Sequence, residues 1–572
     1  MTMQRITTAL LLCLLCVATQ AQEMPKWTKK ARNAIFSIIT YDNQDNIQST
    51  GNGFFISETG EAVSDYTLFK GAERAIVITT TGKQFPVQKI LGADDMYDII
   101  KFQVDTQKEK LTILPLATSP ALAGESVWLL PYSTQKEMKC QIGKIEEIVR
   151  TDKNYNYYTL RLPITEKTVS CPITNQAGEV IALAQTSTSG DEKVSYAIDV
   201  HMAASLNIGA LTANSSALRS IGIRKALPST EKEALVFLYM KAGREKPEVY
   251  LDLLNEFINT YPTTAEGYRR RAEHYVQTFK DSVHYELAEQ DIEKALNLAE
   301  KKDDIHFAFS RMMFQNCVSA QPVRYKDWGL ERSLAECRQA ISIDSIPLYL
   351  QTEGDLLFAL RNYHEAHRAY MAVNSSNLAT ASTWYAAAQS LRLTNDTTQT
   401  VADSVLALIN HAIACYARPY PQETAPYIWE RAKVLADMGR PREAVADYNE
   451  YYTLMNGNVN DLFYYQREQA AIAGRMNQLA LDDIARAIEL NPQNADYLAE
   501  QASLYVRFNQ PDNAISSCQK ALTLYPDYSD CYRILGICYA LKGEKKLAHD
   551  NLAKAQDLGD PYAESLIEKY CK

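Results

Sequence analysis

ASLYVRFNQPDNAISSCQKA (502–521) is followed, 34 residues further on, by GICYALKGEKKLAHDNLAKA (536–555). Small and large residues recur at the same positions of the two stretches: Ala502, Tyr505, Ala514, Cys518 and Ala521 return as Gly536, Tyr539, Ala548, Leu552 and Ala555. Pro492 and Pro526 are also 34 residues apart, and each stands where a proline would end a helix. A fixed period of this length predicts stacked helix pairs.

The same offsets occur further upstream, at Gly354, Ala366, Tyr370 and Val373, and again at Ala432, Ala444, Tyr448 and Tyr451. This spacing resembles the tetratricopeptide repeat, in which small residues let paired helices approach and large residues fill the space between them. The resemblance implies an all-α superhelical solenoid of about nine helix pairs over residues 231–559. Residues 560–572 are then expected to form a helix that caps the apolar end of the stack. The expected pairs start near residues 231, 265, 303, 347, 381, 425, 461, 495 and 529.

The N-terminal part has a different texture. Between residues 33 and 198 the chain consists of short apolar, β-branched runs such as AIFSIIT and SVWLLPY, separated by glycines at turn positions. Many short strands without long helices between them predict an all-β barrel or sandwich over about residues 30–200. Residues 201–230, which include TANSSALRS, are small and polar enough to predict a linker.

GNGFFISETGEAVSDYTLFKGA (51–72) is the most specific motif of this region. It resembles the opening of trypsin-like serine proteases, nearest to the HtrA-like branch. The family's later segments follow in order, as GADDMYDIIKFQVD (92–105), GESVWLLPYS (124–133), CPITNQAGEVIAL (171–183) and SYAID (195–199). The resemblance implies an all-β double barrel. The whole chain is thus expected to be multidomain, with a trypsin-like double barrel followed by the solenoid.

A trypsin-like protease needs a serine nucleophile, a histidine base and an aspartate that orients the histidine. Carried over by position, the base falls on Thr67, the orienting residue on Asp98 and the nucleophile on Val169. Only the aspartate matches the family. The run KTVSCP (167–172) also lacks the glycine whose N–H shapes the oxyanion hole.

A shift of one residue would bring Ser170 to the nucleophile position, but the chain has no histidine before His201. Without a base, a serine loses several orders of magnitude in rate. Cys171 would need a base or a cation such as Lys167 to form a thiolate, so a buried or disulfide-bonded cysteine is the better interpretation. We therefore expect no catalytic residues and a protease-like module that is inactive.

Residues 1–21 have the pattern of a secretory signal peptide, with Arg5, an apolar stretch from about Ala9 to Ala18, and small residues before a cleavage point near Ala21. An uncleaved anchor is the alternative, although the apolar run is shorter than the roughly 20 residues that span a bilayer. The sequence predicts export to the periplasm, the cell surface or the medium, with no transmembrane segment after cleavage. Export would permit a disulfide between Cys140 and Cys171, although core packing is the default for both.

The overall composition is that of a globular protein, with 46% hydrophobic and 22% charged residues. A net charge of −10 and a pI near 5.5 oppose binding to a phosphate backbone, so nucleic acid is not an expected partner. The motifs of nucleotide and metal sites are missing from the sequence. His364 and His367 are spaced for a metal, but their repeat context favours a solvated helix face, and we expect no metal and no cofactor.

The concave face of the solenoid, formed mainly by the first helix of each pair, is the expected binding site for a protein or peptide. Tyrosine, tryptophan and arginine are enriched in binding hot spots. Offsets within the repeat assign to this face Arg269, Glu273, Trp429, Lys433, Tyr465, Gln469, Ser503, Arg507 and Arg533. The resulting hypothesis is an exported scaffold or adaptor, with two alternatives: an active trypsin-like serine peptidase whose repeats recruit substrate, and a glycan-binding surface protein.

Overall fold

The computed structural model describes residues 25–135, 138–185, 193–209, 212–394 and 398–571. The predicted signal peptide, residues 1–21, lies outside the described residues. The described residues up to His274 form one compact unit, and those from Tyr275 onward form a second.

Six antiparallel strands close the first barrel in the order β1-β2-β3-β6-β5-β4. Along β1 buried residues alternate with half-buried ones, because successive side chains of a strand point to opposite faces. The strands are β1 (Ile35–Tyr41), β2 (Ile47–Phe55), β3 (Glu61–Ser64), β4 (Arg74–Thr79), β5 (Gln84–Asp94) and β6 (Ile99–Val104).

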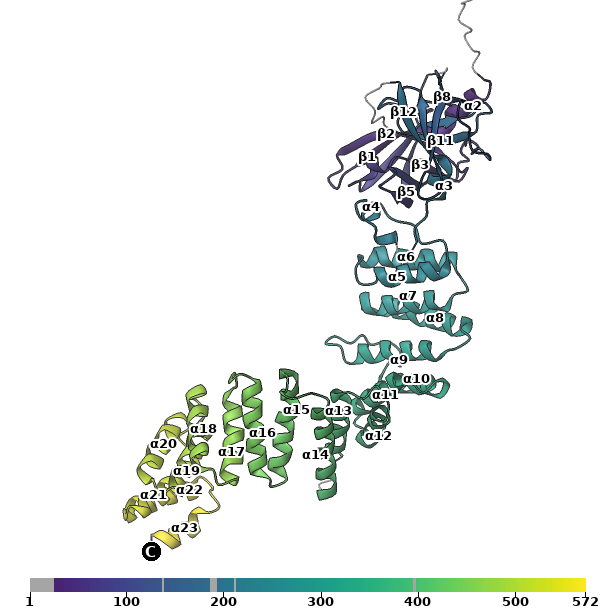
Figure 1. Ribbon diagram of the computed structural model, residues 1–572. Coiled ribbons are helices and arrows are strands. Elements are labelled where there is room, and N and C mark those ends of the chain that lie inside the picture. Colours follow the sequence, from purple (N-terminus) through teal and green to yellow (C-terminus); the bar gives the residue numbers. More distant parts are fainter. Residues whose placement is uncertain (1–24, 136–137, 186–192, 210–211, 395–397, 572) are drawn as a thin grey trace, which may run out of the picture. The chain divides into compact units, whose positions relative to one another are not determined.

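The second barrel is also closed, in the order β10-β11-β12-β9-β8-β7. Its strands are β7 (Ser126–Leu129), β8 (Gln141–Arg150), β9 (Asn156–Arg161), β10 (Pro172–Thr174), β11 (Val180–Gln185) and β12 (Val194–Asp199). Figure 1 shows the strands of both barrels in the purple and blue part of the ribbon. The structure confirms the predicted double barrel, in which closure leaves no unpaired sheet edge.

Residues 201–230, predicted from their polar composition to be a linker, are largely packed against the first barrel. They contain most of α3 (Val200–Ser205) and all of α4 (Ser216–Arg219). Beyond α4 the backbone binds the barrel directly: the Gly71 amide donates to the Ser220 carbonyl at 2.7 Å, and the Ala226 amide donates to the Ile90 carbonyl at 2.8 Å.

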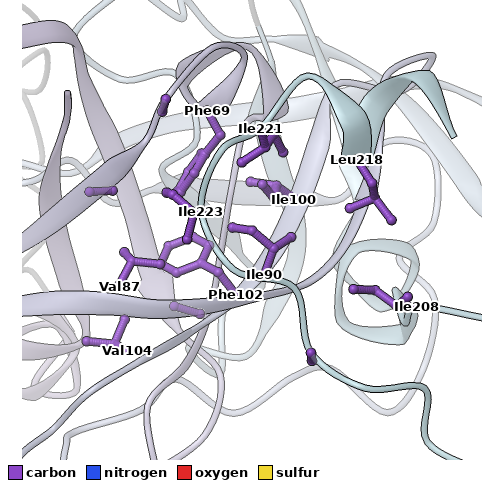
Figure 2. Close-up of a cluster of buried hydrophobic side chains, with 14 of the residues drawn as sticks. Phe69, Val87, Ile90, Ile100, Phe102, Val104, Ile208, Leu218, Ile221 and Ile223 are labelled. Atoms are coloured by element: carbon purple, nitrogen blue, oxygen red, sulfur yellow. The ribbon is translucent and has the colours of Figure 1, made fainter. Parts of the chain in front are cut away.

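Buried side chains of this segment extend the core of the first barrel. Ile221 and Ile223 are 1% and 4% exposed. Figure 2 shows them beside Phe69, Ile100 and Phe102 of the barrel. The segment is therefore part of a folded core.

The first helix pair, α5 (Glu231–Lys241) and α6 (Pro247–Thr260), belongs to the same compact unit. Phe237, Leu254 and Phe257 are buried in the hydrophobic cluster that also contains the residues of Figure 2. Glu256 adds a polar contact, because its carboxylate pairs with Lys89 of β5 at 2.6 Å and with Arg224 at 2.7 Å. One core thus runs from the first barrel into the first helix pair.

The rest of the chain is helical, and the structure confirms the predicted all-α region (Figure 1). Helix α7 (Ala265–Thr278) crosses from the first unit into the second. The later helices are α8 (Ser282–Leu298), α9 (Asp303–Cys317), α10 (Leu330–Ile343), α11 (Pro347–Ala359), α12 (Tyr363–Asn374), α13 (Ala381–Arg392), α14 (Gln399–Ala414), α15 (Ala425–Asp437), α16 (Pro441–Leu454), α17 (Asp461–Ala473), α18 (Asn477–Leu490), α19 (Ala495–Arg507), α20 (Pro511–Leu524), α21 (Ser529–Leu541), α22 (Lys545–Asp557) and α23 (Ala563–Tyr570).

Small residues lie where the two helices of a pair are closest. A Cβ at Gly354 of α11 would lie 2.8 Å from the Tyr370 ring of α12, and a Cβ at Gly536 of α21 would lie 2.5 Å from Leu552 of α22. Both distances are shorter than van der Waals contact, so a side chain at either glycine would require the facing Tyr370 or Leu552 to move.

A buried arginine–aspartate ion pair joins the two helices in each of two successive helix pairs. The Arg431 guanidinium of α15 donates two hydrogen bonds of 2.7 Å to Asp447 of α16. One pair later, Arg467 of α17 donates to Asp483 of α18 at 2.7 and 2.8 Å. Each arginine also reaches back to an asparagine of the preceding helix, Asn410 and Asn449 respectively. These bidentate contacts fix the register of three consecutive helices.

In the part of the chain that the structure describes, no helix combines the length and the apolar character needed to cross a membrane. The thiols of Cys140 and Cys171 are free, and Cys171 is buried in the core of the second barrel. Core packing, the default interpretation from the sequence, is what the structure has for Cys171.

Candidate functional site

Thr67 and Asp98, the residues at the family's base and orienting positions, are in direct contact. Thr67 lies in the short 3-10 helix η2 (Tyr66–Phe69), which follows β3, and Asp98 lies just before β6. Asp98 Oδ1 accepts a hydrogen bond of 2.7 Å from the Thr67 amide and one of 2.8 Å from Thr67 Oγ1. Both donors of Thr67 are therefore used by the carboxylate that would orient a histidine in an active protease.

Ser170 is fully buried, and its hydroxyl donates to Asp65 Oδ1. Its amide donates to the Ala184 carbonyl at 2.9 Å, and its φ of 61° lies in the left-handed region that favours glycine. The hydroxyl is directed to a carboxylate and shielded from solvent. Ser170 is thus held as a structural hydrogen-bond donor.

Burial raises the pKa of Asp65 to about 6, although the Ser170 hydroxyl favours the ionised form. The charge of Asp98 raises the pKa of Asp65 as well. The two carboxylates and their two hydroxyl partners, Thr67 and Ser170, therefore form one polar cluster.

Val169 stands at the family's nucleophile position and has no group that could attack a carbonyl. Its carbonyl accepts from Asn52 Nδ2 at 3.2 Å, and the same amide donates to the Lys167 carbonyl at 3.0 Å. Burial raises the pKa of the adjacent Cys171 to about 12, which keeps the thiol protonated. Neither neighbour of Ser170 supplies a nucleophile.

A cavity of about 490 Å³ lies beside Asp98. It is lined by Met96, Tyr97, Asp98, Val149, Arg150, Thr151, Tyr157 and Gln185. None of these lining residues is a histidine. His201 lines a separate cavity with Asp199, whose Oδ1 lies 3.0 Å from His201 Nδ1. The imidazole nearest in sequence is thus engaged by a different aspartate.

A second, larger cavity of about 750 Å³ lies near the C-terminal end of the helical region, and we call it the C-terminal cavity. Its walls come from α17, α19, α21 and α23. Tyr465, Ser503, Arg507 and Arg533, which the sequence assigned to the concave face, all line it. The structure brings these four side chains together around one cavity.

The other residues assigned to the concave face lie elsewhere. The Trp429 ring packs 5.2 Å from the Tyr448 ring and 5.0 Å from the Tyr451 ring, and Lys433 pairs with Glu430 at 3.1 Å. Arg269 belongs to the first compact unit.

Two carboxylates engage Arg269: Glu266 at 2.7 Å and Glu273 at 2.7 Å. Gln469, also assigned to this face, donates to Glu468.

Among the described residues, no group of three or more histidine, cysteine, aspartate or glutamate side chains is arranged to hold a metal ion.

Comparison with known proteins gives relatives for both parts of the chain. Residues 51–183 match the family model of the trypsin-like peptidase domain. The N-terminal region is thus similar in sequence to trypsin-like peptidase domains, and its two closed barrels fit that likeness. Over 165 residues the chain is 23% identical to HhoA of Synechocystis sp., whose name assigns it to the serine proteases. Over 101 residues it is 28% identical to small glutamine-rich tetratricopeptide repeat-containing protein 2 of Saccharomyces cerevisiae.

These matches cover 27% and 18% of the chain, and 42% and 29% of the two relatives respectively. The chain therefore spans less than half the length of each relative that it matches. Together with the two barrels and the long helical region, they confirm the resemblance to a trypsin-like domain joined to tetratricopeptide repeats.

Sequence analysis missed one residue of the trypsin-like domain's polar cluster. Asp65 lies two positions before Thr67, inside the motif at 51–72, but it is not at one of the family's three catalytic positions. The signal was a carboxylate at the end of a strand, in VSDY (63–66), where burial would demand a partner. The partner, Ser170, is 105 residues away in the chain.

Proposed function

We propose that the protein is an exported scaffold that binds protein segments through its repeats and whose trypsin-like domain does not cut them. The observation that carries the proposal is the contact between Thr67 and Asp98. A threonine has no pKa near neutrality and does not serve as the general base of a serine nucleophile. With the Asp98 carboxylate bound to both donors of Thr67, the orienting group has no imidazole to orient.

The cavity beside Asp98 supports the same proposal. Its described lining contains no imidazole, and the hydroxyl of Ser170 is directed to the buried Asp65. An active peptidase, the alternative, would need an exposed serine hydroxyl within hydrogen-bond reach of a base. Export enters the proposal from the pattern of residues 1–21, and the mass of the mature N-terminus in a cell fraction tests it.

The first experiment is labelling of the mature protein with a fluorophosphonate probe, beside a casein-cleavage assay and a Ser170→Ala control. We expect neither labelling nor cleavage. Labelling that Ser170→Ala abolishes would reject the proposal and favour the active peptidase. A Ser170→Ala variant must first match the wild type in its circular dichroism, so that loss of labelling is not loss of folding.

A further inference from the structure

Carboxylates outnumber cations around the C-terminal cavity. Asp496, Glu500 and Asp530 line it together with Arg507 and Arg533. The Arg533 guanidinium is already compensated, because it pairs with Asp530 and lies 3.3 Å from the buried Asp560. Among the described residues, the side chains of Glu500 and Arg507 form neither a hydrogen bond nor an ion pair.

Two of these carboxylates, together with Glu468 of α17, converge on one tyrosine. Burial raises the pKa of Tyr465, and the charges of Glu500, Glu468 and Asp496 raise it further. These groups come from two helices, α17 and α19, so the convergence is a product of the fold. The Tyr465 ring thus forms an aromatic wall beside an acidic one.

Glu468 is an unusual member of this group. It is fully buried, its Oε2 accepts from Gln469 at 2.8 Å, and its Oε1 has no hydrogen-bond partner. Glu468 follows Tyr465 by three positions on α17, so the two side chains share one face of the helix. Burial and then the charge of Glu500 raise the pKa of Glu468 to about 8. Asp483 of α18 also raises it, whereas the Gln469 hydrogen bond and the charge of Arg507 lower it.

We propose that the C-terminal cavity binds a lysine- or arginine-containing segment of a partner protein, with the cationic group held between Glu500 and Asp496 and against the Tyr465 ring. A cation beside an aromatic face and two carboxylates gains both cation–π and ion-pair energy. The volume of about 750 Å³ is large enough for a side chain and its flanking backbone.

This proposal specifies the partner chemistry of the scaffold and rests on the proposed function. It also predicts a proton signature. A bound cation next to Glu500 stabilises the ionised form of Glu468, so binding at pH 7 releases a proton.

The test uses the full mature chain and fluorescein-labelled peptides of alternating leucine and lysine, leucine and glutamine, or leucine and glutamate. By fluorescence anisotropy we expect the lysine peptide to bind at least about tenfold more tightly than the glutamine peptide. Glu500→Gln should weaken lysine-peptide binding by about tenfold or more. Glu489→Gln, an exposed change of the same charge on α18, should leave it unchanged.

Equal losses in Glu500→Gln and Glu489→Gln would overturn the proposal, because they would indicate attraction by the net charge of the chain. If the glutamine or glutamate peptide binds best and Tyr465→Ala weakens it, the scaffold function stands and the charge inference is wrong. If none of the three peptides binds, both fail.

Calorimetry in phosphate and in Tris separates the proton release from the contact itself. The binding enthalpy of the wild type should differ between the two buffers, and that difference should vanish in Glu468→Gln. A buffer-independent wild-type enthalpy would contradict the role given to Glu468. The thermal midpoint of Glu468→Gln, measured beforehand, shows that the variant is folded.

Discussion

Thr67 and Asp98 are joined by two hydrogen bonds to the same carboxylate oxygen, at 2.7 Å from the amide and 2.8 Å from the hydroxyl. The pair connects the short helix that follows β3 to the residue that precedes β6, and these two strands are neighbours in the first barrel. Asp98 has a φ of 50°, which is uncommon for a residue with a Cβ. The retained aspartate thus has a structural use that does not depend on catalysis.

Thr67→Val removes only the hydroxyl donor and keeps the side-chain shape. We expect a loss of about 0.5–1.5 kcal/mol in the free energy of unfolding, because a single solvent-exposed hydrogen bond is removed. Thr67→Ser should lose less, since the donor remains. Urea unfolding followed by tryptophan fluorescence measures both, and identical midpoints for the two variants would show that the hydroxyl contributes nothing.

Ser170 combines a buried hydrogen bond with a left-handed backbone. Ser170→Ala should cost about 1–3 kcal/mol, because Asp65 loses a buried donor while the backbone stays strained. Ser170→Gly loses the same donor but accepts the φ of 61° without strain, so it should be about 1 kcal/mol more stable than the alanine variant. Equal urea midpoints for the two variants would contradict a strained Ser170.

Glu468 predicts a pH dependence of the helical region. Its pKa is about 8 in the folded chain and 4.5 ordinarily, so the folded state binds the extra proton between these values. The contribution of Glu468 to stability is therefore fully present below pH 4.5 and is lost as the pH rises through 8, by roughly 4–5 kcal/mol.

Urea midpoints of the helical circular dichroism at pH 5 and pH 8 test this dependence. Glu468→Gln should flatten it and raise stability at pH 8, whereas Glu489→Gln should retain it. A Glu468→Gln variant that loses as much stability as the wild type would assign the dependence to other groups.

The buried pair of Arg467 and Asp483 predicts a large effect of a single change. Arg467→Ala leaves Asp483 buried without its cation and should cost about 3–5 kcal/mol. Arg486→Ala, which removes an exposed cation paired with Glu489, should cost less than about 0.5 kcal/mol. Replacing both partners, as Arg467→Met with Asp483→Leu, should recover most of the lost stability, measured by thermal unfolding. If stability is not recovered, the Arg467–Asn449 hydrogen bond and the packing of the arginine account for the loss.

Ile223 tests the packing of residues 201–230 on the first barrel. Ile223→Ala should cost about 2–4 kcal/mol, because it opens a cavity beneath a side chain that is 4% exposed. The exposed Ile47→Ala, at 62% exposure, serves as the control and should change little. We also expect Ile223→Ala to speed limited proteolysis between residues 201 and 230, and unchanged cleavage would mean that Ile223 does not hold the segment down.

The repeat pattern predicted the helical region well because its signal is local and periodic. Gly354 and Gly536 are small for the same reason, namely contact with a large residue of the second helix of the pair. The double barrel was predictable from motif order, since the segments around Thr67 and Asp98 keep the family's sequence of elements.

What the sequence did not reveal depends on contacts between distant residues. The bond from Ser170 to Asp65 joins positions that no periodicity relates. In residues 201–230 the polar composition of TANSSALRS predicted a linker. The burial of Leu218, Ile221 and Ile223 depends on a barrel surface that only the fold creates. Likewise, a glutamate such as Glu468 is expected on the solvated face of a helix, but neighbouring helices bury it.

The core that runs from Phe36 of the first barrel through Ile223 to Phe257 of α6 has an evolutionary consequence. A recombination break between residues 201 and 230 would split this core, and each product would expose buried apolar side chains to water. The trypsin-like domain and the first helix pair would therefore be inherited, exchanged and lost as one piece, whereas helix pairs further along could be duplicated or deleted singly.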